Sequence, residues 1–188
     1  MKKAYIFLAE GFEDVEALGT VDVLRRGGVD VELVSITEDP LVLSSHGVTF
    51  GVDTTLEMGI GIDKDDVMVF PGGLKGAENL AACTPLIEEM KAHIEEGGPV
   101  AAICAAPGLV LGQLDSLKGV KFTCYDGFET VPASKGGEFI RKPAVTSGNI
   151  ITGRGPGYAL DFGLELLKFI KGEAAAEKVR SGMFIPCE

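Results

Sequence analysis

The sequence has no tryptophan, only two histidines, and four cysteines that lie far apart without a C-x-x-C spacing. Structural zinc sites use closely spaced cysteine and histidine ligands, so we predict no metal. The turn after the first apolar run lacks G-x-G-x-x-G, and G-x-x-x-x-G-K-[ST] does not occur. Because these glycine patterns hold nucleotide phosphates, we predict no cofactor. The glycine cluster GRGPG at 153–157 is interpreted as a tight turn into the last helix.

Basic residues are too few for a nucleic-acid-binding protein. Lys and Arg number 17 against 28 Asp and Glu, a formal net charge of −11. Nucleic acids require a basic stripe and anionic membranes repel an acidic chain, so we predict neither partner. No apolar run approaches the roughly 20 residues of a membrane span. The N-terminal run AYIFLA is shorter than a signal-peptide core and precedes acidic residues. We therefore expect a cytoplasmic protein.

The hydrophobic pattern predicts an α/β fold of one domain over residues 1–188. Strands that alternate with helices and are apolar throughout indicate a mostly parallel sheet with helices on both faces, a three-layer sandwich. In the last helix we expect Leu160, Leu164 and Leu167 to point inward. The predicted strands are 3–9, 29–36, 65–73 (ending in a turn), 99–104, 121–125, 137–141 and 149–154, with short-strand and turn material over 40–53; the predicted helices are 13–28, 76–98, 107–114 and 157–172.

Three predicted strands end in segments with candidate functional residues: AEGFEDVE, FPGGLKGA and CAAPG. Ligands of an open α/β sheet bind beyond the carboxyl ends of its strands. Cys104 stands at such an end, before Pro107, which fits a first helical turn. A helix N-terminus stabilises a thiolate, so Cys104 can be a nucleophile with a pKa below the ordinary value of about 8.5. It can equally be a core thiol, since free cysteine is among the most buried residue types.

The neighbouring signals also have two interpretations each. The Glu16 carboxylate can reach the same sheet edge, or it can be a solvated acid that the helix dipole favours. Gly72 and Gly73 form either a plain turn or a close backbone approach to a substrate. Ala105 leaves its backbone N–H open to a developing oxyanion. Taken singly, none of these residues assigns a function.

Together the segments resemble a known family. The motifs AEGFEDVEALGTVDVLRR, VFPGGLKGAENL, AAICAAPG and TGRGPGYALDFGLELL, in this order, are similar to the ThiJ/PfpI family and within it to the Parkinsonism-associated deglycase (DJ-one) branch. The resemblance spans nearly the whole chain and implies a flavodoxin-like sandwich and a homodimer. It places the nucleophile of the family on Cys104 and its partner glutamate on Glu16. It places the backbone oxyanion donors on Gly73 and Ala105.

The chain departs from the family pattern at several positions. Protease-like members carry a histidine after the cysteine, where this chain has Ala105, so proteolysis loses support. Animal members of the branch have arginine at the position of His46 and histidine at that of Tyr125. His46 is either a cation near an acidic substrate or an ordinary loop residue. Arg26 matches a basic residue that the family places near the pocket from the neighbouring subunit. We list His46, Tyr125 and Arg26 as candidate substrate-binding residues.

The remaining candidates are interpreted more simply. His93 is expected at the surface, and Arg154 is expected to anchor the GRGPG turn. Cys124 is either a core residue of a strand or a second thiol in the cleft. Cys83 and Cys187 carry no motif.

The leading functional hypothesis is a cysteine-dependent enzyme that acts on reactive carbonyls. Its substrate is a small carbonyl compound such as methylglyoxal, converted to lactate without glutathione, or a glycated protein, in a deglycase reaction. In both cases a Cys104 thiolate adds to a carbonyl and Glu16 moves protons. The competing hypothesis is a redox sensor or stress-response chaperone whose signal is the oxidation of Cys104. A cysteine peptidase or amidase is a third alternative.

Overall fold

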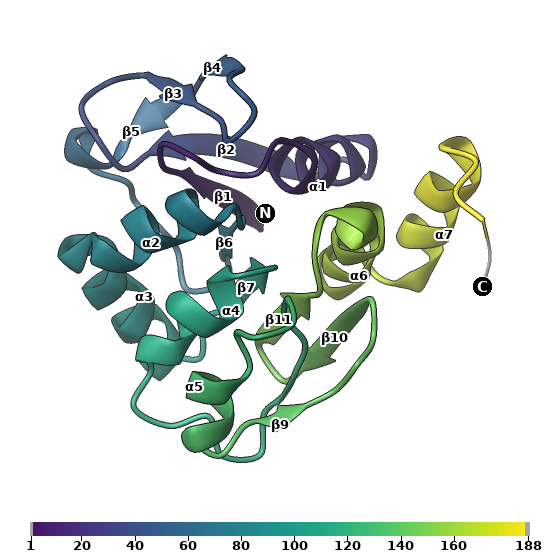
Figure 1. Cartoon of the computed structure of the whole chain (residues 1–188). Helices are drawn as coiled ribbons and strands as arrows, with labels where there is room; N and C mark the ends of the chain where they lie inside the picture. The colour runs from purple at the N-terminus through teal and green to yellow at the C-terminus, as the bar shows by residue number, and fades with distance from the viewer. Residues whose placement is uncertain (1, 187–188) are drawn as a thin grey trace.

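The computed structural model describes residues 2–186 of the chain. It contains a seven-stranded sheet in the order β10-β11-β7-β6-β1-β2-β5. Helices α1 and α6 cover one face of this sheet, and α2 and α3 lie on the other (Figure 1). Within the described residues, β10 and β11 are the only antiparallel neighbours in this sheet, and the other pairs are parallel. The predicted three-layer α/β sandwich with a mostly parallel sheet is confirmed.

The strands of the central sheet are short, and three of the inner ones are buried along their whole length. They are β1 (Lys3–Leu8), β2 (Asp30–Ser35), β5 (Thr54–Thr55), β6 (Val67–Phe70), β7 (Val100–Ile103), β10 (Ala144–Ser147) and β11 (Ile150–Gly153). Two smaller sheets pair β3 (Leu41–Leu43) with β4 (Thr49–Gly51) and β8 (Lys121–Phe122) with β9 (Glu138–Phe139). Every residue of β6, β7 and β11 is buried because helices cover both faces of the sheet.

The helices connect the strands and close the two faces. The α-helices are α1 (Asp14–Arg26), α2 (Leu74–Ala82), α3 (Thr84–Glu95), α4 (Ala106–Leu109), α5 (Thr130–Ser134), α6 (Ala159–Lys171) and α7 (Glu173–Gly182). Three single-turn 3-10 helices are η1 (Leu56–Met58), η2 (Leu111–Gln113) and η3 (Pro156–Tyr158). None of the helices in residues 2–186 is both long and apolar enough to span a membrane.

Small residues let α1 and α6 pack closely. A Cβ on Gly163 of α6 would lie 3.0 Å from the Cβ of Val23, and one on Gly27 would lie 2.3 Å from Leu167 Cδ1. On the outer side of α1, Val15 and Leu18 are 54% and 37% exposed. The helix therefore keeps an apolar strip that no described residue of this chain covers.

Several predicted elements differ in the structure. The helix predicted over 76–98 is two helices that meet at Cys83, because Pro85 follows and favours a new helix start. The strands β8 and β9 are shorter than predicted and form a separate two-stranded sheet. The elements β10, α5 and α7 were not predicted. In α6, Leu164 and Leu167 are buried as expected, but Leu160 is only half-buried.

The surface position predicted for His93 is wrong. The side chain is 5% exposed, and its Nε2 is 3.0 Å from the carbonyl oxygen of Asp66. A Cβ on Gly98 would lie 2.4 Å from the ring, so the imidazole lies directly against this glycine. His93 therefore has a packing role. Cys187 lies outside the described residues.

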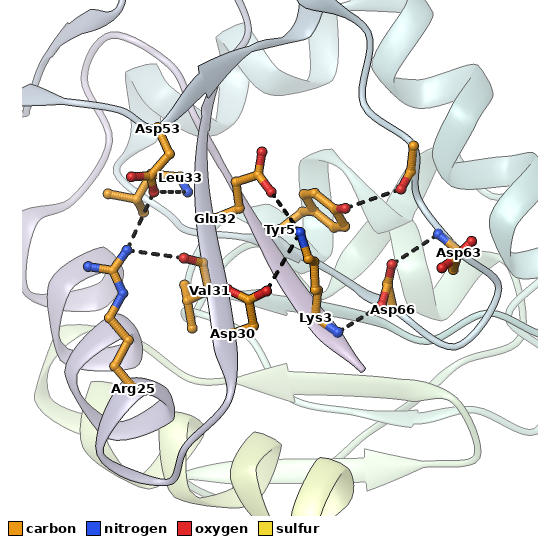
Figure 2. Close-up of polar contacts among 11 residues, drawn as sticks. Lys3, Tyr5, Arg25, Asp30, Val31, Glu32, Leu33, Asp53, Asp63 and Asp66 are labelled. Carbon is orange, nitrogen blue, oxygen red and sulfur yellow. Dashed lines mark hydrogen bonds and ion pairs between the residues drawn. The ribbon is translucent and has the colours of Figure 1, made fainter. Parts of the chain in front are cut away.

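Polar residues at the start of β1 and β2 fix the loop that precedes β6 (Figure 2). The backbone N–H of Lys3 donates to Asp66 Oδ1 at 2.7 Å, and the Tyr5 hydroxyl donates to the carbonyl oxygen of Gly61 at 3.1 Å. Asp53 accepts from the backbone N–H of Leu33 at 2.8 Å. The first two contacts lie in the amino-terminal half of β1 and the third holds the segment before β5 against β2, whereas Cys104 follows the carboxyl end of β7. We assign them to the fold and not to the candidate site.

Candidate active site

Cys104 lies on a sharp turn between β7 and α4. Its φ angle is 66°, in the left-handed region that costs a residue other than glycine roughly 1–2 kcal/mol. Two hydrogen bonds hold this backbone: the N–H of Cys104 donates to the Gly153 carbonyl at 3.0 Å, and its own carbonyl accepts from Tyr125 N–H at 2.8 Å. The thiol is 8% exposed. The predicted strand-to-helix turn is therefore present, with a strained backbone at the cysteine.

Glu16 projects from the first turns of α1 and is fully buried. Its Oε2 accepts a hydrogen bond from Gly72 N–H at 2.8 Å, whereas its Oε1 has no hydrogen-bond partner among residues 2–186. The helix begins here because Glu13 acts as the N-cap and accepts from the backbone N–H of Glu16 at 2.7 Å. The solvated position that the sequence left open for Glu16 is wrong.

Gly72 is the contact point between the carboxyl group and the thiol. A Cβ at Gly72 would lie 2.5 Å from Glu16 Oε2, 2.5 Å from Cys104 Cβ and 3.0 Å from Cys104 Sγ. Any larger residue would force these groups apart. Gly73 has a φ angle of 80° and packs against Gly11, whose carbonyl oxygen would lie 2.3 Å from an added Cβ. The pair of glycines therefore forms a close backbone approach.

Backbone donors and a carboxyl group act in opposite directions on the Cys104 thiol. Burial raises the pKa of Cys104 to about 12, helped by the charge and hydrogen bond of Glu16, while the backbone N–H groups of Gly73 and Ala105 lower it. Burial likewise raises the pKa of Glu16 to about 7. The sequence predicted a thiol pKa below the ordinary value; the structure gives the opposite direction. Burial and the neighbouring Glu16 raise the pKa of Cys104 by more than the backbone N–H donors, which the sequence suggested, lower it.

His46 lies on the turn between β3 and β4, which covers the start of α1. Its Nδ1 is 2.8 Å from Asp14 Oδ2, and this hydrogen bond raises the pKa of His46. Ser44 donates to the same carboxylate through its hydroxyl at 2.5 Å. Glu13, Asp14 and His46 each place one ligand-type atom within 4.8 Å of the others, so this is where the described residues could hold a cation. His46 contacts α1 at Asp14, two residues before Glu16, and its hydrogen bonds within the described residues go to Asp14 and Ser45, not to the thiol.

The other candidate residues occupy two different places. Tyr125 is 51% exposed and is tied to Cys104 by the backbone hydrogen bond described above. Arg26 forms an ion pair with Asp22 at 2.9 Å on the surface of α1. It lies ten residues after Glu16, about 15 Å along the helix. Within one chain, Arg26 and the thiol therefore do not share a pocket.

Sequence reasoning missed two groups of residues near Cys104. Glu13 was not a candidate, although its position three residues before Glu16 in an N-cap is a readable signal. Asp126 was also missed; it forms an ion pair with Arg154 at 2.6 Å, just beyond Tyr125. No pattern in the sequence predicts the contact between Asp126 and Arg154, since these residues come from loops 28 positions apart. Cys124 is fully buried, and burial raises its pKa to about 12.

Comparisons with known proteins agree with this architecture. The model of the DJ-1/PfpI family matches residues 2–169. The chain is 37% identical over 178 residues to Protein DJ-1 homolog B of Arabidopsis thaliana, and this match covers 95% of this chain and 40% of that protein. It is 30% identical over 172 residues to the glutathione-independent glyoxalase DJR-1.2 of Caenorhabditis elegans, covering 91% of this chain and 90% of that one. The crystal structure of Drosophila melanogaster DJ-1beta superposes with a TM-score of 0.90 at 31% identity and covers 100% of both chains.

The relatives differ in length. The chain spans less than half of the Arabidopsis homologues A and B, 46% and 40% respectively.

Proposed function

The chain belongs to the DJ-1/PfpI family, and from this premise we propose that it is a cysteine-dependent enzyme for small reactive carbonyl compounds. The observation that carries the proposal is the fully buried Glu16, with its pKa raised to about 7, beside the Cys104 thiol. A carboxyl group with a pKa near neutral can both take and return a proton at physiological pH. We further propose that residues 1–188 act as one domain in the cytoplasm.

The proposed reaction begins with proton transfer. The Glu16 carboxylate takes the thiol proton of Cys104 as the sulfur adds to the aldehyde carbon of methylglyoxal, and the carbonyl π electrons move onto oxygen. The backbone N–H groups of Gly73 and Ala105 stabilise the negative charge that develops in the site. Because the thiol pKa is high, Glu16 acts here as a general base and not as a donor to a preformed thiolate.

The remaining steps need no external oxidant. The aldehyde carbon of the hemithioacetal loses its hydrogen as a proton, and the neighbouring ketone carbon gains one, which gives a thioester of lactate. Water then adds to the thioester carbonyl, the C–S bond breaks, and the sulfur recovers a proton from Glu16. The first carbon is oxidised and the second is reduced, so the sum is methylglyoxal plus water to lactate and a proton, which is released to solvent. The deglycase reaction would begin with the same addition of sulfur to the carbonyl-derived carbon of a glycation adduct.

A redox sensor is the second candidate function. The same backbone donors, Gly73 and Ala105, can bind an oxidised sulfur, and peroxide can convert the thiolate to sulfenate and then sulfinate. A peptidase is less well supported, because neither described histidine pairs with the thiol: His46 bonds Asp14 and His93 bonds Asp66.

We also propose a homodimer built on α1. The exposed Val15 and Leu18 form an apolar strip on the outer side of this helix. A second copy on this strip would let the partner subunit's Arg26 approach the site, which the Arg26 of the same chain does not reach. The proposed roles of Arg26, His46 and Tyr125 in substrate binding rest on the resemblance and on this arrangement.

Turnover of methylglyoxal tests the proposal. Purified protein should release lactate without glutathione, and Cys104→Ala should release none above the uncatalysed rate. If the wild-type protein matches Cys104→Ala, the carbonyl enzyme is rejected. The sensor is then tested by mass spectrometry of the Cys104 peptide after peroxide.

A further inference from the structure

Beside the candidate active site lies a cavity that the proposed reaction of methylglyoxal does not use. Its volume is about 280 Å³, and its walls are the side chains of Tyr125, Asp126, Arg154 and Tyr158 with the backbone of 155–157. We propose that it is a subsite for the hydroxylated tail of a larger carbonyl substrate, a 2-oxoaldehyde derived from a sugar. This inference rests on the proposed function, since the reacting end of the substrate would be at Cys104.

The backbone of Cys104 anchors both walls of this cavity. Tyr125 donates its N–H to the carbonyl of Cys104 at 2.8 Å, and Cys104 donates its N–H to the carbonyl of Gly153, the residue before Arg154, at 3.0 Å. The backbone of Cys104 is therefore hydrogen-bonded to one wall residue, Tyr125, and to the residue that precedes another, Arg154. The proposal places the reacting carbon of the substrate at the sulfur and its next carbons towards this cavity.

Arg154 provides a donor that has no acceptor in the described chain. Its Nη2 bonds Asp126 Oδ1 at 2.6 Å, whereas its buried Nη1 has no hydrogen-bond partner among residues 2–186. The arginine side chain is 19% exposed. Leaving a buried donor unpaired has an energetic cost. A ligand oxygen that side-chain movement brings to this guanidinium would recover that cost.

Aromatic rings form the sides of the cavity. The Tyr125 ring lies against Gly155, where an added Cβ would be 3.2 Å from its Cδ2. Tyr125 and Tyr158 are 51% and 41% exposed, a high value for such large rings. Their faces can cover C–H groups while their hydroxyls exchange hydrogen bonds with a ligand. Amphipathic walls of this kind fit a chain that carries both C–H and O–H groups.

The charges favour a neutral, hydroxylated tail over a carboxylate. Asp126 bonds both Arg154 and, at 3.3 Å, Arg141, so an incoming carboxylate would lie beside a carboxylate that already contacts both guanidinium groups. A hydroxyl can accept from the arginine and donate to Asp126 at the same time. The volume is also slightly below that of pockets for drug-sized ligands, as expected for a tail of a few carbons. Methylglyoxal, once bound to sulfur through its aldehyde carbon, has only its ketone carbon and a methyl group beyond it and no hydroxylated tail to fill the cavity.

A comparison of two aldehydes distinguishes binding at the subsite from the reaction at Cys104. We compare kcat/KM for 3-deoxyglucosone, a six-carbon 2-oxoaldehyde with a hydroxylated tail, with kcat/KM for methylglyoxal. Tyr158→Ala and Arg154→Met should lower the ratio of the two values at least tenfold. Arg141→Met is the matched control, because it also removes a partner of Asp126 but lies outside the cavity walls; it should change the ratio less than threefold. Equal ratios in all four proteins would overturn the subsite. Tyr158→Phe, which retains the ring, keeps the test valid if an alanine variant fails to fold.

Binding without reaction distinguishes failure of the subsite from failure of the proposed function. Saturation-transfer NMR on Cys104→Ala should detect xylitol, and the signal should disappear when Arg154→Met is added. If wild type converts neither aldehyde but this binding pattern holds, the proposed function is wrong and the subsite stands. If methylglyoxal is converted but xylitol does not bind, the subsite is wrong and the function stands. If glutarate binds instead of xylitol, the assigned ligand class is overturned.

Discussion

Glu16 and Cys104 meet across Gly72, so closely that a single methyl group at Gly72 would lie 2.5 Å from Glu16 Oε2 and 2.5 Å from Cys104 Cβ. The glycine also donates its N–H to the carboxyl at 2.8 Å. The proton-transfer distance between the two reacting groups is therefore set by a residue that takes no part in the chemistry.

Gly72→Ala should separate the two groups. Contacts below 3.0 Å cannot be kept, so the carboxyl or the thiol has to move, and we expect carbonyl turnover to fall at least a hundredfold. Overpacking of this kind costs about 1–3 kcal/mol of stability. Gly61→Ala is the matched control, because an added Cβ there meets nothing within 4 Å. Steady-state kinetics and thermal melts of both variants test the idea, and an active Gly72→Ala protein would contradict it.

Glu16→Gln separates catalysis from oxidation. The amide keeps the shape of the carboxyl but cannot accept and return a proton, so turnover should fall by roughly 10²–10⁴-fold. Oxidation of Cys104 should persist, because Glu16 raises the pKa of the thiol and its removal favours the thiolate. Lactate release and peroxide-dependent sulfinate formation are measured on both proteins. Undiminished turnover in Glu16→Gln would show that the carboxyl is not the proton shuttle.

The pH dependence of turnover should report the carboxyl. If Glu16 acts as a base with a pKa raised to about 7, kcat/KM should rise as pH increases through 7 and then level off. A preformed thiolate paired with a neutral Glu16 predicts the reverse above pH 7, since the donor proton is lost. Rates from pH 5.5 to 9 with methylglyoxal distinguish the two. The residual activity of Glu16→Gln serves as the control, because its kcat/KM should not show this rise through pH 7.

The sequence predicted well where Cys104, Glu16 and Gly73 lie in the fold, because these positions depend on local rules. An apolar run that ends at a cysteine before two alanines and a proline already describes a strand, a turn and a helix start. The rule that ligands bind beyond the carboxyl ends of parallel strands then brings Glu16 and Gly73 to the same edge.

The remaining features depend on packing that no local pattern encodes. The rise of the Cys104 pKa comes from burial and from a carboxyl 88 positions earlier in the chain. The cavity beside Tyr125 depends on an ion pair between two loops. The burial of His93 depends on Gly98, which lies three residues after the end of the same helix and leaves space for the ring. Each of these three features can be predicted only from the tertiary structure.

The apolar strip of α1 should govern dimer formation. Leu18→Glu would bury an unpaired charge in the proposed contact, at a cost of about 3–5 kcal/mol, and so weaken the dimer about a hundredfold or more. Met58→Glu is the control, since Met58 is 77% exposed in η1, away from α1. Light scattering across micromolar concentrations should give the mass of two chains for wild type and Met58→Glu and of one chain for Leu18→Glu. A wild-type protein with the mass of one chain would reject the dimer.

The buried carboxyl should also make stability depend on pH. Below pH 4.5, Glu16 is protonated in both the folded and the unfolded chain. As pH rises, the unfolded carboxyl ionises first, so the free energy of unfolding falls between pH 4.5 and about 7 and then levels off. A pKa raised from 4.5 to about 7 corresponds to about 3 kcal/mol. Glu16→Gln cannot ionise and should therefore be more stable than wild type at pH 8, by up to this amount, and nearly equal at pH 4.5. Urea unfolding of both proteins at the two pH values measures the difference. Parallel pH profiles for the two proteins would mean that the folded chain accommodates the ionised carboxyl without cost, and the assignment of Glu16 as a base with a raised pKa would fail with it.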